Sequence, residues 1–350
     1  MKVRISNETK EFRTVWMENK LVKMIDQTKL PYKFEIFTSH DYKQTAEAIK
    51  KMIVRGAPAI GVTAVFGLVQ AISAANENNS DELIKKATKT IRETRPTAYN
   101  LFWGVDRILK VIQEVDDIED KKNVAIKEAK KIADEDIEVC KKIGELGEKL
   151  IKDGYKILTH CNAGALATVD YGTALSPIRF AHYNGKKIFV FVDETRPRCQ
   201  GSKLTSWELL QEGIDHAIIA DNAAGYYMQK GEIDMCIVGA DRVTLDGSVA
   251  NKIGTYEKAV LAKENKIPFY VALPTSTIDI NTKSGKDIPI EERNEEEVTH
   301  IVAENKKIRI SAEGSHAKNP AFDVTPSKYI TAFITERGII KPFDVKKLFK

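Results

Sequence analysis

In the segment KILTHCNAGALATVDYGTA, residues 156–174, an apolar run is followed by residues whose side chains could do chemistry. The run stops at His160, and Cys161 and Asn162 follow directly. A buried cysteine usually behaves as a small hydrophobic residue. At the end of a strand, however, the backbone N–H groups of a turn and of a helix start lower the pKa of a thiol. The small-residue turn and the helix expected after it make Cys161 a candidate catalytic residue, because such a position can lower the pKa of its thiol.

The other three cysteines lie in different surroundings. Cys140 has apolar neighbours in a helical pattern and Cys236 lies inside a strand-like run, so both are expected in the core. Cys199 falls in a polar loop, and its role stays open. The spacing of the four cysteines contains no CxxC pair and no zinc pattern, which favours free thiols in a reducing compartment.

A carboxylate ends a second apolar run, CIVGAD, at Asp241. One interpretation is a helix cap or a salt bridge to the neighbouring Arg242. The other is a general acid or base, which needs burial to raise the pKa of the carboxyl group towards neutrality. Both interpretations stay open from the residues alone.

Two arginines precede predicted helix starts in the first half of the chain. Arg55 stands before Gly56 and Ala57 in RGAPAIG, and Arg95 stands before a proline in RETRPTAYNLFWG. An arginine beside the free N–H groups of a helix start is a good site for a phosphate group. Each arginine can equally be an ordinary surface cap.

Three further polar residues follow apolar runs in the second half. Gln200 lies in the loop DETRPRCQGSKLT, for which a solvated loop is the simple alternative. Asn251 and Lys252 stand in VANKIGTYEKAVLAK, where they are expected near the start of a helix. From that position they can meet an anionic or hydroxylated ligand.

The elements that must position these residues show a regular alternation in the second half. Short apolar runs alternate with helix-compatible stretches, which predicts a parallel sheet covered on both faces. The runs lie at 155–160, 187–192, 216–220, 235–240 and 268–273. Ligands bind at the carboxyl ends of such strands, where the unusual polar residues of this chain gather. No GxGxxG motif follows the first run and no histidines pair at metal-ligand spacing, so no dinucleotide cofactor and no metal are expected.

The first half predicts a mainly helical domain with a small sheet. The segment 13–26 reads as a hairpin, and a long charged helix runs from about Lys121 to Lys152. The expected domains are residues 1–125, a connecting helix over 126–152, and a Rossmann-like domain over 153–350. The tail from about Ile290 opens with the charged IEERNEEEV and is expected to add strands or to cover an interface.

The overall composition fits a soluble, cytoplasmic protein. Of the 350 residues 43% are hydrophobic, the net charge is +4, and no basic block accompanies it. That balance argues against a nucleic-acid partner. The N-terminus has no secretory h-region, and no apolar run approaches the length of about 20 residues that a membrane helix needs.

Seven motifs in order resemble the methylthioribose-1-phosphate isomerase family over about Trp16 to Asp279. They are RGAPAIG, TRPTAYNLFW, THCNAGALAT, DETRPRCQGSKLTSWEL, DNAAGYYM, GADRVTLDGSVANKIGTYEKAVLAK and LPTSTID. The wider superfamily includes ribose-1,5-bisphosphate isomerases and the regulatory subunits of translation initiation factor 2B. The resemblance implies a homodimer that isomerises a 5-substituted ribose 1-phosphate to the ribulose 1-phosphate in methionine salvage.

The resemblance also implies roles for nine residues. Asp241 is the proton donor and Cys161 the second catalytic residue. The implied substrate-binding residues are Arg55, Gly56, Ala57, Arg95, Gln200, Asn251 and Lys252. Hydrogen then moves from C2 to C1 either as a proton, with Cys161 as base, or as a hydride.

Two alternatives stay open. The same catalytic pair serves an isomerase of 5-deoxyribose 1-phosphate or of ribose 1,5-bisphosphate, and only the walls around the sugar C5 decide between them. A regulatory binding protein like the initiation-factor subunits shares the fold without the chemistry. The presence of both Cys161 and Asp241 favours the enzyme.

Overall fold

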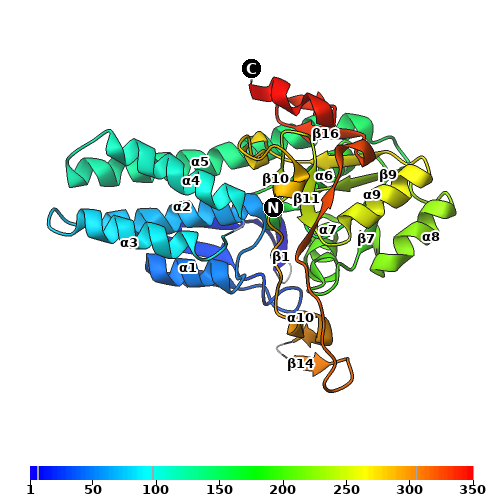
Figure 1. Cartoon of the computed structure of the whole chain (residues 1–350), viewed down its shortest axis with the longest axis horizontal. Coiled ribbons are helices and arrows are strands. Elements are labelled where there is room, and N and C mark those ends of the chain that lie inside the picture. The colour runs from blue at the N-terminus through cyan, green and yellow to red at the C-terminus, as the bar shows by residue number, and fades with distance from the viewer. Residues whose placement is uncertain (6–7, 97, 305, 350) are drawn as a thin grey trace.

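The structure is a computed structural model that describes residues 1–5, 8–96, 98–304 and 306–349 (Figure 1). Helices of the first half form one side of the molecule, and a seven-stranded sheet with its helices forms the other (Figure 1). The α/β class and the mainly helical N-terminal region with small sheets are therefore confirmed.

The N-terminal region starts with two small antiparallel sheets. β1 (Lys2–Ile5) pairs with β2 (Glu8–Glu11), and β4 (Leu21–Ile25) lies between β3 (Val15–Glu18) and β5 (Ile36–Ser39). The expected hairpin is thus present as β3 and β4. Its turn residues Asn19 and Lys20 both have positive φ, which is the backbone that a tight hairpin turn requires.

Five helices follow, and four of them pack around α2. They are α1 (Tyr42–Lys50), α2 (Ala57–Ala74), α3 (Ser80–Arg92), α4 (Tyr99–Gln113) and α5 (Ile118–Gly147). Small residues let α4 approach closely, because a Cβ on Gly61 of α2 would lie 2.8 Å from the backbone oxygen of Asn100. The sequence analysis expected no apolar run of nearly membrane-spanning length, and α2 corrects that expectation. The 18 residues of α2 are long and apolar enough by composition, but 89% of them are buried in the protein, as in a core helix.

Helix α5 links the two sides of the molecule. Asp117 caps its start by accepting hydrogen bonds from the N–H groups of Glu119 and Asp120. Its first half packs on α2 and α4, and its later part packs on α6 and on a strand of the large sheet. Cys140 faces that interior and is fully buried, as the sequence predicted.

The large sheet contains all five predicted strands. Its order is β17-β16-β12-β9-β6-β7-β8, with β16 and β17 antiparallel and every other pair parallel. The bounds are β6 (Lys156–Thr159), β7 (Phe189–Asp193), β8 (His216–Ile219), β9 (Met235–Val238), β12 (Phe269–Ala272), β16 (Ala332–Thr335) and β17 (Gly338–Ile340). The tail therefore adds β16 and β17 to this sheet.

Helices cover both faces of the large sheet. Along β6, Ile157 packs towards α5 and α6 (Leu175–Tyr183), and Leu158 packs towards α8 (Ala224–Gln229) and α9 (Thr255–Glu264). α7 (Ser206–Glu212) joins the first of these faces. Successive side chains of a strand point to opposite faces, and burial on both explains why each strand reads as an unbroken apolar run.

Smaller elements of the second half border the sheet. β11 (Val249–Lys252) lies between β10 (Arg242–Val243) and β15 (Phe322–Thr325), and β13 (His300–Ala303) pairs with β14 (Lys306–Arg309). The short helix α10 (Glu296–Thr299) and the β13–β14 hairpin project from the body of the molecule (Figure 1).

Candidate active site

Cys161 and Asp241 follow neighbouring strands of the large sheet. From β8 to β16 the strand order along the chain is 3-2-1-4-5-6, which reverses direction between β6 and β9. Ligands of doubly wound sheets bind in the crevice at that reversal, outside the carboxyl ends of the strands. Cys161 leaves β6 and Asp241 leaves β9, so both residues lie at this crevice.

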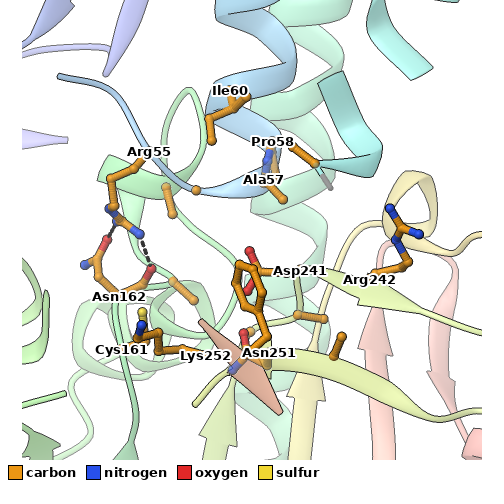
Figure 2. Close-up of a pocket in the computed structure, with 18 of the residues that line it drawn as sticks. Arg55, Ala57, Pro58, Ile60, Cys161, Asn162, Asp241, Arg242, Asn251 and Lys252 are labelled. Atoms are coloured by element: carbon orange, nitrogen blue, oxygen red, sulfur yellow. Dashed lines mark hydrogen bonds between the residues drawn. The ribbon is translucent and has the colours of Figure 1, made fainter. Parts of the chain in front are cut away.

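One cavity collects the predicted site residues. It holds about 1100 Å³, including space open to solvent. All nine line it, namely Arg55, Gly56, Ala57, Arg95, Cys161, Gln200, Asp241, Asn251 and Lys252. The start of α2 forms one wall and the ends of β6 and β9 form the facing wall (Figure 2). The structure thus brings together residues that are up to 197 positions apart, from Arg55 to Lys252.

The backbone of Cys161 is held in an unusual conformation. Its φ is 66°, a left-handed value that a non-glycine residue keeps only where its surroundings enforce it. Its N–H donates to Thr195 Oγ1 at 2.8 Å, and its carbonyl accepts from Thr205 Oγ1 at 2.6 Å. These two bonds fix the direction of the thiol.

The pKa of the Cys161 thiol is raised, so the lowering that its position allows is not realised. Burial raises the pKa of this thiol, although the charges of Arg55 and Lys252 oppose the shift. The expected helix start does not follow the cysteine directly, because a short turn over Ala165–Ala167 intervenes and α6 begins only at Leu175. The thiol therefore stays protonated near neutral pH.

Asp241 behaves as a buried acid. Burial raises the pKa of its carboxyl group, and the charges of Arg95, Arg293, Lys252 and Arg55 oppose that shift. Arg242, the partner in the alternative salt bridge, pairs with a different carboxylate. Arg242 lies 3.6 Å from Asp279 and points away from Asp241 (Figure 2). A protonated carboxyl group at this position can donate a proton to a substrate oxygen.

Arg55 joins the start of α2 to the segment after Cys161. Its Nη1 donates to the backbone oxygen of Asn162 at 2.8 Å, and its Nη2 donates to the Asn162 side chain (Figure 2). Its Nε donates to Gln27 at 3.0 Å. Gly56 precedes α2 with φ 94°, and a Cβ there would lie 2.5 Å from Ala167 Cα. Only glycine permits this approach, which places the free N–H groups of Ala57 and the first turn of α2 at the cavity.

Three predicted residues carry buried polar atoms without a partner among the described residues. These atoms are Arg95 Nε, Gln200 Oε1 and Lys252 Nζ. An unpaired buried polar atom costs free energy. A ligand with anionic and hydroxyl oxygens would satisfy all three, because two of the atoms belong to cations and one is an acceptor.

Asn251 and Lys252 lie at the end of β11, directly before α9, which begins at Thr255. The strand itself was not predicted. The pairing of β11 with β15 fixes both side chains in extended backbone. Asn251 donates to Thr255 Oγ1 at 3.0 Å. Burial lowers the pKa of Lys252, as does the nearby charge of Arg293.

His160 supports the floor of the cavity. Its Nδ1 lies 2.8 Å from Asp193 Oδ2 and its Nε2 lies 2.8 Å from the carbonyl of Ile253. The ligand atoms of His160, Asp193 and Asp221 lie within 4.8 Å of one another. Both oxygens of Asp221 already accept backbone N–H bonds, and Lys258 Nζ lies 3.9 Å from Asp193. Protein groups thus contact most ligand atoms of this group, whereas Asp193 Oδ1 has no partner among the described residues.

The sequence reasoning missed Arg293. This residue lines the cavity, and its side chain is only 8% exposed. Its segment, IEERNEEEV, reads as a charged surface run, so no local signal distinguishes it. Asn162 was noticed as a polar residue after β6, but its bonds to Arg55 and to Glu208 were not foreseen.

Comparisons with known proteins agree with this geometry. The model of the initiation factor 2 subunit family matches residues 53–342. The methylthioribose-1-phosphate isomerase of Acetivibrio thermocellus is 55% identical over 93% of this chain and 95% of its own. The chain belongs to the initiation factor 2 subunit family. Within that family it groups with the methylthioribose-1-phosphate isomerases, which are aldose–ketose isomerases.

Solved structures of the family share the whole fold. The 5-methylthioribose 1-phosphate isomerase of Pyrococcus horikoshii is 46% identical, covers 97% of this chain and 96% of its own, and has a TM-score of 0.89. A structure titled translation initiation factor eIF-2B, subunit delta, from A. fulgidus is 44% identical over 95% of this chain and 97% of its own, with a TM-score of 0.83. The family resemblance and the isomerase class are therefore confirmed.

Proposed function

We propose that the chain isomerises 5-methylthioribose 1-phosphate to 5-methylthioribulose 1-phosphate in methionine salvage. One observation carries this proposal. A buried carboxyl group and a buried thiol, Asp241 and Cys161, face one cavity that also holds Arg55, Arg95 and Lys252. Isomerases at 52–56% identity support the choice of substrate.

The chemistry of the substrate explains the need for such a cavity. Phosphate on the anomeric oxygen prevents ring opening to a free aldehyde, so the ring must open while C1 stays phosphorylated. A protonated Asp241 donates to the ring oxygen. The cations hold the phosphate, and binding energy from this non-reacting group lowers the barrier at C1 and C2.

Cys161 stands where hydrogen moves from C2 to C1. On the proton route a base removes hydrogen from C2, and a thiol with a raised pKa is a poor base at neutral pH. On the hydride route hydrogen passes directly to C1, and apolar walls that exclude water assist it. Ala57, Pro58 and Ile60 supply such walls beside the two catalytic residues (Figure 2). We favour the hydride route, with Cys161 lining the path.

Kinetics on three substrates test this function. Purified protein is assayed for ketose formation from 5-methylthio-, 5-deoxy- and 5-phosphoribose 1-phosphate. We expect the highest kcat/KM with the methylthio sugar. A higher kcat/KM with either of the other two sugars would identify that sugar as the substrate. If none of the three is turned over, a regulatory binding protein like the initiation-factor subunits is favoured.

We further propose a cytoplasmic homodimer that uses only the sugar phosphate as its ligand. All four cysteines are free thiols, which suits a reducing compartment. Light scattering on the purified chain tests the dimer, and a monomeric mass at micromolar concentration would contradict it.

A further inference from the structure

Arg293 reaches the cavity from an extended segment of the tail. Its N–H donates to the carbonyl of Asn319 at 2.9 Å, and the carbonyl of Glu291 accepts from the N–H of Ala321 at 2.8 Å. Alternate residues of an extended segment point to the same side. Glu291 and Arg293 therefore share one side, and Glu292 points to the other, where it accepts from the N–H of Asn319 at 2.6 Å.

One carboxylate lies between two buried guanidinium groups. Glu291 Oε1 is 3.1 Å from Arg293 Nε, and Glu291 Oε2 is 3.7 Å from Arg95 Nη2. The side chains of Arg95 and Arg293 are 11% and 8% exposed, against 29% for Glu291. Both arginines line the cavity, whereas Glu291 is absent from its described lining. The carboxylate thus holds the two guanidinium groups from outside the cavity.

The same small sheet aligns Arg293 with Lys252. The guanidinium of Arg293 lies 5.5 Å from the centre of the Phe322 ring, and Phe322 is the β15 partner of Lys252 on β11. Arg293, Lys252 and Phe322 all line the cavity. Stacking on an aromatic face restrains a guanidinium group and leaves its edge free to bind.

The cluster carries more positive charge than its own carboxylate can balance. Two guanidinium groups share Glu291, and the buried Arg95 Nε has no partner among the residues described. Buried charge without compensation is costly. A phosphate group offers two negative charges and accepts paired N–H bonds from arginine.

We infer that Arg293 binds the phosphate group of the substrate together with Arg95, and that Glu291 positions the two guanidinium groups. The identity of the sugar rests on the proposed function, whereas the binding of phosphate by this cluster does not. Arg293 is thereby a binding residue supplied by the tail, and the wall that it forms completes the site.

Calorimetric titration of inorganic phosphate into the full chain tests the inference. We expect Arg293→Ala to weaken phosphate binding by about tenfold or more, the usual effect of removing a charge-assisted hydrogen bond. Arg13→Ala is the matched control, because Arg13 pairs with Asp134 on the surface and is 48% exposed. This control should bind phosphate as the wild type does.

A second variant keeps the test decisive if Arg293→Ala does not fold. Arg293→Gln keeps much of the side-chain volume and removes the charge, so the same loss is expected. Wild-type affinity in either folded variant would overturn the inference, as would a wild-type chain that binds no phosphate. Normal phosphate binding without isomerase turnover would overturn the proposed function alone.

Kinetics separate binding from packing. Asp241 is surrounded by four cations and by the titratable thiol of Cys161. The cations are Arg55, Arg95, Lys252 and Arg293. Loss of Arg293 removes one cation, which raises the pKa of Asp241 further. The alkaline limb of kcat/KM should therefore move to higher pH in Arg293→Ala, with a raised KM. If the alkaline limb of kcat/KM does not move in Arg293→Ala, Arg293 has only a structural role in packing.

Discussion

Both side-chain and backbone oxygens of Asn162 accept hydrogen bonds from the Arg55 guanidinium group. Asn162 directly follows Cys161, and its Nδ2 donates to Glu208 Oε1 at 2.9 Å. Glu208 in turn accepts from the N–H groups of Ala165 and Leu166. The asparagine thus connects the start of α2, the segment of Cys161 and a buried carboxylate.

Replacement of Asn162 by alanine should disturb that connection. Arg55 loses its side-chain acceptor and Glu208 loses a donor, so we expect a loss of about 1–3 kcal/mol in the free energy of unfolding. Activity should fall as well, because the backbone at Cys161 is released. Urea unfolding and kcat report the two effects. Asn78→Ala, in an exposed loop, should change neither quantity.

Cys161→Ser and Asp241→Asn should each abolish turnover while the fold survives. A serine hydroxyl is smaller and less polarisable than the thiol, and an asparagine cannot donate a proton to the ring oxygen. We expect kcat to fall by about a thousandfold or more, the range of general-acid catalysis. Circular dichroism checks folding, and Cys140→Ala, in α5 and outside the lining of the cavity, should remain active. Full activity in either catalytic variant would remove its assignment.

Turnover in deuterated water distinguishes the two hydrogen-transfer routes. A proton taken up by a base exchanges with solvent, so the proton route places deuterium at C1 of the product. The hydride route does not. Because burial raises the pKa of Cys161, we expect almost no deuterium at C1 by mass spectrometry. The purified ketose, incubated alone, supplies the correction for spontaneous exchange.

Arg95→Ala should act mainly on substrate binding. The buried Arg95 Nε has no partner among the described residues, which fits a group that pairs with the phosphate of the substrate. Loss of its charge should raise KM by about 10- to 100-fold, with a smaller change in kcat. An unchanged KM would argue against its phosphate role. Arg92→Ala serves as the control, because Arg92 pairs with Asp106 and does not line the cavity.

Asp136 should make stability depend on pH. Burial raises the pKa of its carboxyl group from 3.8 to about 7, and the N–H of Val169 donates to it at 2.7 Å. Since the folded chain binds this proton more tightly than the unfolded chain, stability from this group falls as pH rises from 3.8 to about 7 and is constant above. Asp136→Asn should therefore stabilise the protein at pH about 8 and have little effect near pH about 4.

Denaturant unfolding at the two pH values measures that difference. Asp134→Asn, exposed on the same helix, should show no such dependence on pH. An equal effect of Asp136→Asn at both values would show that its carboxyl group titrates normally.

Local patterns predicted the scaffold well. Each of the five apolar runs is a strand, because burial on both faces leaves no polar alternation in a parallel sheet. The ends of those strands then located Cys161 and Asp241 at the same edge. Gly56 and Ala57 were placed correctly at a helix start because the proline that follows them is typical of the first turn of a helix.

The features that sequence reasoning missed depend on contacts between distant segments. Lys252 lies on a strand whose partner, β15, is about 70 residues away along the chain, so only the pairing reveals its extended backbone. Arg293 is buried by Phe322 and by pairing with residues 319–321, although its own segment is highly charged. The pKa of Cys161 likewise follows from burial by both sides of the molecule.

The four cations around Asp241 also affect how fast a substrate reaches the cavity. Low-dielectric walls concentrate the field of such a cluster at the mouth of the cavity. An anionic sugar is drawn in faster than a neutral one of equal size, and dissolved ions weaken the attraction. The rate of encounter, unlike the hydrogen transfer inside, is thus set partly by the ionic strength of the surrounding fluid.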